Sequence, residues 1–134
     1  PEMPTARAHC AVASVGHYLF VVGGEADDVG KEASAAVERF DSETGEWQSL
    51  PPMPRPRLRA VAGHVRGLIV VAGGSGTTLP APLSSGRGGG GAAAIARRAT
   101  FLIPLPRGDT WAFDLALRRW APLPSMPTAP SRAA

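Results

Sequence analysis

Two stretches of the chain decide its fold, because each of them occurs twice. Residues 3–24 read MPTARAHCAVASVGHYLFVVGG and residues 53–74 read MPRPRLRAVAGHVRGLIVVAGG, with seven of 22 positions identical at an offset of 50. Residues 40–54, FDSETGEWQSLPPMP, match residues 113–127, FDLALRRWAPLPSMP, at seven of 15 positions and an offset of 73. Two matching blocks in the same order predict two copies of one structural unit.

Each copy has the pattern of four short strands joined by tight turns. Small and β-branched residues at 8–15 and an apolar run at 18–22 predict the first two strands, and residues 36–40 and 46–50 predict the other two. We expect the first strand to be buried on both faces, because nearly all of its residues are apolar. In the second copy the corresponding strands are expected at residues 58–65, 68–72, 110–113 and 119–123.

The difference of 23 residues between the two offsets is one insertion in the second copy. We assign residues 75–108 to it, because they contain Pro80, Pro82 and a run of four glycines. Such a segment has too little apolar side chain to offset the entropy that ordering costs. The sequence therefore predicts a disordered, low-complexity insertion.

A glycine pair that closes the second strand, an aromatic residue in the third strand and a tryptophan seven residues later resemble the Kelch repeat. These motif residues are Gly23, Gly24, Phe40 and Trp47 in the first copy and Gly73, Gly74, Phe113 and Trp120 in the second. Phenylalanine stands where tyrosine is commoner, which removes a hydroxyl group and keeps the packing role. The resemblance covers residues 1–74 and 109–127.

The resemblance implies an all-β fold, a partial Kelch-type β-propeller with two four-stranded antiparallel blades. The first strand of each blade would line the central channel, and the aromatic residues would stack between blades. Residues 1–52 would form the first blade, residues 53–125 the second blade with its insertion, and residues 126–134 the start of a third repeat or a tail.

Two blades do not close a ring, so we expect the chain to be a piece of a longer propeller. Further blades or self-association would then complete the fold. The isolated chain should be only marginally stable, and its open sheet edges should be prone to association.

Composition argues against several classes of partner. The net charge of +3 combines a net −6 over residues 1–50 with a net +9 over residues 51–134, where the basic residues are scattered arginines without interleaved aromatic residues. We therefore expect no nucleic-acid partner. We also expect no membrane partner, because the longest apolar runs have only the length of a strand. Cys10 is the single cysteine, which favours a cytoplasmic or nuclear protein.

The side chains that could carry chemistry lack the spacing that chemistry requires. His9, His17 and His64 do not form a metal or catalytic pattern, and the acidic stretch at residues 25–32 lacks the regular oxygen spacing of a calcium loop. The glycine-rich stretch at residues 73–76 lacks the Lys-Ser/Thr of a phosphate-binding loop. We therefore expect no metal, no cofactor and no enzymatic activity.

Four basic residues are the candidate partner-binding residues: Arg57, Arg59, His9 and Arg7. In Kelch propellers, partners commonly bind on the face formed by the loops between strands two and three and the connections between blades. The resemblance places Arg57 and Arg59 at that face, where the chain enters the inner strand, and His9 is the equivalent of Arg59 in the first copy. Two arginines there could fork onto a carboxylate of a bound peptide. Alternatively, Arg57 or Arg7 ties down the connection by bonding to backbone carbonyls, and the sequence leaves both roles open.

The resemblance implies a protein-interaction scaffold. Many similar Kelch propellers recognise substrates for cullin-type ubiquitin ligases and carry a BTB or F-box domain before the repeats; neither domain is present in these residues. The alternatives are a cytoskeleton-binding protein or an enzyme, either a copper oxidase or a sugar isomerase. A galactose-oxidase-type site requires two tyrosines, two histidines and a cysteine cross-link, whereas this chain has one tyrosine, Tyr18.

Overall fold

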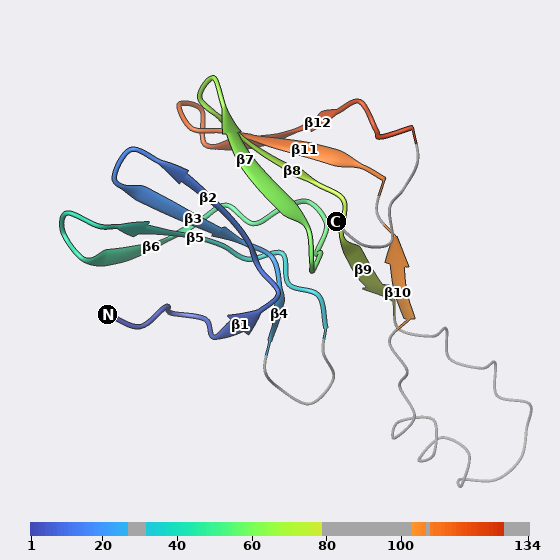
Figure 1. Ribbon diagram of the computed structural model, residues 1–134, viewed down its shortest axis with the longest axis horizontal. Helices are drawn as coiled ribbons and strands as arrows, with labels where there is room; N and C mark the ends of the chain where they lie inside the picture. Colours follow the sequence, from blue (N-terminus) through green and yellow to red (C-terminus); the bar gives the residue numbers. More distant parts are fainter. Residues whose placement is uncertain (27–31, 79–102, 107, 128–134) are drawn as a thin grey trace, which may run out of the picture.

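The computed structural model describes residues 1–26, 32–78, 103–106 and 108–127. All regular structure in these residues is β-strand, arranged as two four-stranded sheets and two two-stranded pairs (Figure 1). The strands are β1 (Arg7–Ala8), β2 (Ala11–Val15), β3 (Tyr18–Val22), β4 (Glu25–Ala26), β5 (Val37–Asp41), β6 (Glu46–Leu50), β7 (Val61–Val65), β8 (Leu68–Ala72), β9 (Ser75–Thr78), β10 (Ile103–Pro106), β11 (Thr110–Asp114) and β12 (Arg119–Leu123).

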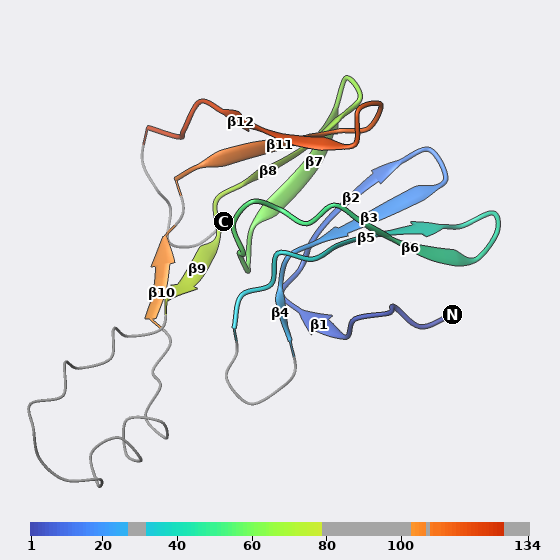
Figure 2. The same cartoon turned by 180° about the vertical axis from the view of Figure 1, so that it is seen from behind.

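The two large sheets are successive copies of one antiparallel blade. Blade 1 has the order β2-β3-β5-β6, and blade 2 has the order β7-β8-β11-β12. The first strands, β2 and β7, lie side by side, and the outer strands fan away from them (Figures 1 and 2). This arrangement confirms the predicted fold, a partial propeller whose two blades do not close a ring.

The strand bounds agree with the prediction for the second and fourth strands, differ by one residue in the third strands, β5 and β11, and differ most at the beginning of each first strand. Residues 18–22, 46–50, 68–72 and 119–123 form the predicted strands. The first strands were expected from residues 8 and 58, but β2 and β7 begin three residues later. The physical reason is that His9 and Arg59 adopt left-handed backbone, with φ of 54° and 55°, which interrupts extended pairing.

Strand register gives each blade two distinct faces. Directly opposite residues of an antiparallel sheet point to the same side. We call one side the aromatic face, because it carries Phe40 and Trp47 in blade 1 and Phe113 and Trp120 in blade 2. The other side is the aliphatic face, which in blade 1 carries Ala11, Ala13, Phe20, Val22, Val37 and Leu50.

The core lies where the aromatic face of blade 2 packs on the aliphatic face of blade 1. Ile69, Val71 and Phe113 are at most 2% exposed and join the aliphatic-face side chains of blade 1 in one buried cluster. Met53, from the connection between the blades, belongs to the same cluster. Burial of each large side chain contributes about 1.5–3 kcal/mol, so this interface holds the two blades together.

The first strands are not buried on both faces, which corrects the prediction. In β2, Ala11 and Ala13 are buried, but Val12 between them is 50% exposed; in β7, Val61 and Val65 are 50% and 55% exposed. The alternation arises because only one face of β2 meets the neighbouring blade, while the outward face of β7 belongs to the aliphatic face of blade 2.

The aromatic rings pair within each blade, and the rings of blade 2 also pack at the core between the blades, as predicted. Phe40 and Trp47 lie directly opposite on β5 and β6, with ring centroids 5.0 Å apart and planes tilted by 42°. Phe113 and Trp120 repeat this on β11 and β12 at 5.2 Å and 46°. Phe113 also contributes to the core between the blades.

The predicted disordered insertion is ordered at its two ends. Strand β9 pairs with β10 from Ser75 opposite Pro106 to Thr78 opposite Ile103. The threonines and the isoleucine have high β propensity, and the prolines stand on a strand that pairs on one side only. Residues 79–102, the rest of the predicted loop, and residues 128–134 of the predicted tail lie outside the described residues, so the domain boundaries stay predictions.

None of the described residues lies in a helix with the length and apolar character that crossing a membrane requires.

Candidate functional site

The two ends of the blades differ in the kind of connection that they carry. One end carries the tight turns between first and second strands and between third and fourth strands. The other end carries the connections from β3 to β5, from β8 to β11 and from β6 to β7, together with the small pairs β1–β4 and β9–β10 (Figures 1 and 2). We call this second end the mouth, and all four predicted partner-binding residues lie at it.

Arg7 lies within blade 1 as a buried tie. Its side chain is fully buried, and its Nη1 donates to the carbonyl oxygens of Gly23 and, at 3.0 Å, Ala36. Its Nη2 donates to Glu38 Oε2 at 2.7 Å, and Thr5 Oγ1 donates to the other oxygen of the same carboxylate at 2.8 Å. The arginine therefore joins the incoming chain to the second and third strands of the blade.

Arg57 occupies the equivalent place in blade 2. Its side chain is also fully buried, and its Nη1 donates to the carbonyl oxygens of Gly73 at 3.2 Å and Asp109 at 3.1 Å. Its Nη2 donates to Asp109 Oδ2 at 2.8 Å, and Trp111 Nε1 donates to that same oxygen at 2.6 Å. Both arginines thus have the second of the two predicted roles, in which the side chain bonds to backbone carbonyls of its own blade.

Asp109 is held ionised by its neighbours. Burial raises the pKa of this carboxyl, but the hydrogen bond from Trp111 and the charge of Arg57 outweigh burial and lower the pKa below its ordinary value. A paired carboxylate is what a buried guanidinium requires, because an uncompensated buried charge is costly. The sequence analysis missed Glu38 and Asp109, since they occupy different positions in the two repeats.

The glycine pairs allow the connections to approach the strand ends closely. Gly24 and Gly74 have φ of 99° and 76°, in the left-handed region that favours glycine. A Cβ on Gly24 would lie 2.5 Å from the carbonyl oxygen of Ala8, and one on Gly74 would lie 2.5 Å from that of Leu58. Each glycine therefore leaves room for the chain that enters the first strand.

Arg59 and His9 are the predicted residues whose side chains reach solvent at the mouth. Arg59 is exposed, and the side chain of His9 is 46% exposed. The two residues share the same left-handed backbone, and the Arg59 amide donates to the His9 carbonyl at 2.9 Å, which ties the equivalent points of the two blades together. His9 Nδ1 lies 2.5 Å from Glu25 Oε1 on β4. The structure therefore brings Arg59 together with a histidine–carboxylate pair.

Cys10, beside His9, lacks the character of a nucleophile. Burial raises the pKa of its thiol; Arg7 lowers it, and Glu38 adds a further increase, with a net shift upward. Reactive and metal-binding cysteines have a lowered pKa instead. Cys10 is therefore a small apolar residue that fits under Gly24.

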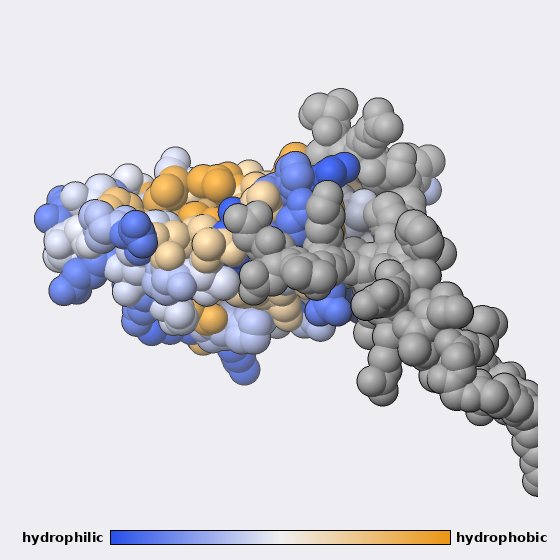
Figure 3. Space-filling view, turned by 90° about the horizontal axis from the view of Figure 1, so that it is seen from below, coloured by the Kyte–Doolittle hydropathy of each residue, from blue (hydrophilic) through white to orange (hydrophobic). Residues whose placement is uncertain are grey.

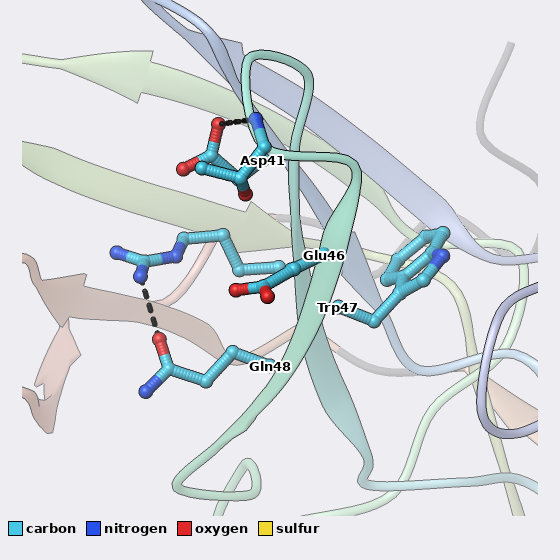
Figure 4. A pocket seen from close by; sticks show the side chains of 6 residues that line it. Asp41, Glu46, Trp47 and Gln48 are labelled. Carbon is cyan, nitrogen blue, oxygen red and sulfur yellow. Dashed lines mark hydrogen bonds between the residues drawn. The ribbon is translucent and has the colours of Figure 1, made fainter. Parts of the chain in front are cut away.

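A shallow depression of about 340 Å³ lies at the outer strands of blade 1, away from the mouth (Figure 4). Its charged lining is mixed, because Arg39 stands beside the carboxylates of Asp41 and Glu46. Arg39 Nη2 donates to Gln48 Oε1 at 2.6 Å, and its guanidinium lies 4.2 Å from the ring centroid of Tyr18. These contacts engage the guanidinium of Arg39 within blade 1.

Apolar side chains gather on one area of the surface seen from below, with hydrophilic residues at its margins (Figure 3). Val12 on the aromatic face of blade 1, and Val61 and Val65 on the aliphatic face of blade 2, are each at least half exposed. These are the outward faces of the two blades. That further blades or a second molecule cover them stays a prediction.

Comparisons with known proteins give a consistent result. A family model described as "Kelch motif" matches residues 6–54. Kelch-like protein 11 of Homo sapiens is 44% identical over 50 residues, which cover 36% of this chain and 7% of that protein. Beta-scruin of Limulus polyphemus is 37% identical over 73 residues, which cover 54% of this chain and 8% of that protein.

A longer match is found with Kelch domain-containing protein 8B of Homo sapiens. It is 30% identical over 138 aligned positions, which cover 96% of this chain and 32% of that protein. The chain therefore spans about a third or less of the length of these relatives. Among solved structures, one titled "Structure of YjhT" matches with a TM-score of 0.69 at 20% identity over 96% of this chain and 35% of that chain, which shows likeness of fold.

Proposed function

The chain is a Kelch-repeat protein, and from that premise we propose that it is a protein-interaction module that binds its partner at the mouth. Kelch repeats generally mediate protein–protein interaction. The observation that carries the proposal is the exposed Arg59, placed between the two blades, where the other two predicted arginines, Arg7 and Arg57, are fully buried. Because those two hold the scaffold together, Arg59 supplies a cation to a partner.

The chemistry at the mouth suits a segment of protein that carries a carboxylate. A guanidinium presents parallel N–H donors that match a carboxylate in a bidentate way. His9 and Glu25 stand on the blade 1 side of the same end and provide a polar edge to the contact. Arginine is also among the residues that dominate binding energy at interfaces.

The finer assignment that we propose is substrate recognition for a ubiquitin ligase. It is supported by the resemblance of the repeats to those of Kelch substrate receptors. Cytoskeletal binding is the alternative within the same class of function, and the identity of the captured partner separates the two: a cullin complex supports the ligase, and a filament protein supports the alternative.

We propose no enzymatic activity for these repeats. The single tyrosine, Tyr18, contacts Arg39 and the ring of His17 rather than facing the mouth. Among the described residues, the single cysteine has a raised thiol pKa. Both observations argue against the tyrosine and cysteine chemistry of a galactose-oxidase-type site.

Arg59→Asn in the full-length protein tests the binding site. Asparagine tolerates the left-handed backbone, so the substitution removes the guanidinium and keeps the fold. Arg66→Asn is the matched control, because Arg66 is also exposed and left-handed, with φ of 46°, but lies in the turn at the opposite end of β7. Arg59→Asn should weaken the affinity for the partner about thirty-fold, as expected for a loss of about 2 kcal/mol, and affinity purification from cells should recover less partner. Equal recovery with both variants would remove Arg59 from the site.

A further inference from the structure

Three side chains with metal-binding atoms meet at the turn end of blade 1, opposite the mouth. His17 Nε2 lies 3.9 Å from Asp41 Oδ1 and 3.9 Å from Glu43 Oε2, and the ligand atoms of all three residues lie within 4.8 Å of one another. The grouping follows from the sheet register, which places Tyr18 opposite Asp41. Ser42 adds to it, because its amide and its hydroxyl both donate to the His17 carbonyl, at 3.0 and 2.8 Å.

We propose that His17, Asp41 and Glu43 bind Zn²⁺ or a similar transition-metal ion. An imidazole nitrogen and two carboxylate oxygens are ligands that zinc accepts, and three protein ligands leave one tetrahedral position open. Bonds of about 2.0–2.2 Å in a tetrahedral site place the ligand atoms about 3.3–3.6 Å apart. Small side-chain rotations therefore suffice to bring the ligand atoms to these distances. The side chains of Glu43 and His17 are 72% and 38% exposed, so both have room to rotate.

The same chemistry excludes the hard cations at this site. Calcium takes six to eight oxygen ligands, and magnesium requires near-octahedral oxygen coordination. The trio offers a nitrogen in place of one oxygen and too few further oxygens among its own side chains. The site therefore discriminates in favour of a metal that accepts imidazole.

Blade 2 shows that the turn itself requires only one of the three residues. Asp41 Oδ1 accepts from the amides of Glu43 and Thr44 at 2.9 and 3.3 Å. Asp114, its equivalent, accepts from the amides of Ala116 and Leu117, both at 2.9 Å. The turn thus accounts for the aspartate in both blades.

His17 and Glu43 are additions that turn formation does not require. At their places blade 2 has Gly67 and Ala116. The turn of blade 2 forms without either side chain. We therefore infer that His17 and Glu43 serve to bind the metal ion in blade 1. The equivalent turn of blade 2 should then not bind a metal ion.

Neighbouring groups position the trio and leave it accessible. The His17 ring lies 4.0 Å from the ring of Tyr18, which limits the orientations of the imidazole. Arg39 is the nearby cation on the same face of blade 1, and its guanidinium is engaged by Gln48 and the Tyr18 ring. The site therefore keeps its negative charge for an incoming metal.

Titration of the full chain with ZnCl₂ in a non-chelating buffer, followed by calorimetry, tests the proposal. We expect one saturable Zn²⁺ site per chain and no saturable binding of Mg²⁺. Glu43→Ala, which installs the blade 2 residue, and His17→Gln should each weaken Zn²⁺ binding at least about ten-fold. Both positions are on the surface, so circular dichroism should show an unchanged fold.

His64→Gln is the matched control, because it removes an exposed histidine from the other blade. Its Zn²⁺ affinity should equal that of the unsubstituted chain. Absence of saturable binding, or equal binding by Glu43→Ala and His17→Gln, would overturn the proposal. Loss of binding with His9→Gln instead would transfer the zinc to the His9–Glu25 pair and would overturn it as well. The result is independent of the proposed binding at the mouth.

Discussion

Blade 1 and blade 2 hold the same arginine at the same place but balance its charge from different positions. Arg7 pairs with Glu38, which lies within β5, whereas Arg57 pairs with Asp109, which precedes β11. The backbone partners are equivalent in the two repeats, namely the first glycine of the pair and the residue just before the third strand. The comparison shows that the two carbonyls fix the guanidinium, while the carboxylate can come from either of two neighbouring positions.

The two carboxylates differ in how far they are removed from water. The side chain of Glu38 is 3% exposed and that of Asp109 is 23% exposed. Loss of the arginine would leave Glu38 as a deeply buried charge, whereas Asp109 would keep its contact with water and its hydrogen bond from Trp111. The blades should therefore respond unequally to the same substitution.

The largest effect is expected for Arg7→Met. Removing one partner of a buried ion pair costs about 3–5 kcal/mol, because the other charge is left buried. Arg57→Met should lower the unfolding free energy less than Arg7→Met, because its partner Asp109 is more exposed than Glu38. Urea unfolding of the two variants measures the difference, with Arg55→Met as an exposed control. A larger loss for Arg57→Met would show that the carbonyl bonds, rather than the carboxylate, dominate.

The next effect compares the two phenylalanines. Phe113 is 2% exposed in the core between the blades, whereas Phe40 is only partly buried on the outward aromatic face of blade 1. Phe113→Ala should cost about 3–5 kcal/mol of unfolding free energy. Phe40→Ala should cost about 1–2 kcal/mol, because less apolar surface returns to water. Equal losses in a urea titration would mean that blade 2 does not pack on blade 1 as described.

Much of the fold could be predicted from the sequence because repetition restricts the interpretation. The glycine pairs and the Phe-to-Trp spacing fixed the second, third and fourth strands almost to the residue. The late start of β2 and β7 could not be predicted, since few residues other than glycine adopt the left-handed backbone that His9 and Arg59 have. The β9–β10 pair was missed because its partners are separated by residues 79–102 and fall outside the repeat pattern.

The contribution of Asp109 to the unfolding free energy should depend on pH, with an effect that is smaller than those above and confined to acidic pH. The pKa of Asp109 is lowered in the folded chain, so its stabilising contribution is present above the unfolded value of about 3.9 and is lost as the pH falls through the folded value. Asp109→Asn should therefore flatten the acid side of the profile of unfolding free energy against pH. A profile that keeps its full slope below about pH 4 after this substitution would assign the effect to other carboxylates.

The smallest effect concerns the turns between third and fourth strands. Gly45 takes φ of 74°, and the equivalent Arg118 takes φ of 52° without the freedom of glycine. The left-handed strain at Arg118 is about 1 kcal/mol, which the greater chain entropy of glycine partly offsets. Arg118→Gly should therefore stabilise the chain by about 0.5 kcal/mol, seen as a small rise in the urea midpoint. A fall in the midpoint would mean that the Arg118 side chain has a contact of its own.

The candidate site was predictable only in part. Equivalence of Arg59 and His9 followed from the repeat, and the structure places both at the mouth. Whether Arg7 and Arg57 face a partner or their own blade could not be decided, because the sequence does not show which carbonyls converge on them. The His17 trio was missed for the same reason, since its members come from two turns that only the register brings together.

The packing of the aromatic face of one repeat on the aliphatic face of the preceding repeat is the relationship on which the mouth depends. Nuclear Overhauser contacts in the isotopically labelled chain test it most directly. We expect cross-peaks from the methyl groups of Ile69 and Val71 to apolar side chains of blade 1 in the shared core, such as Ala13 and Val22. Cross-peaks confined to pairs within each blade would contradict the arrangement, and with it the placement of Arg59 between the two blades.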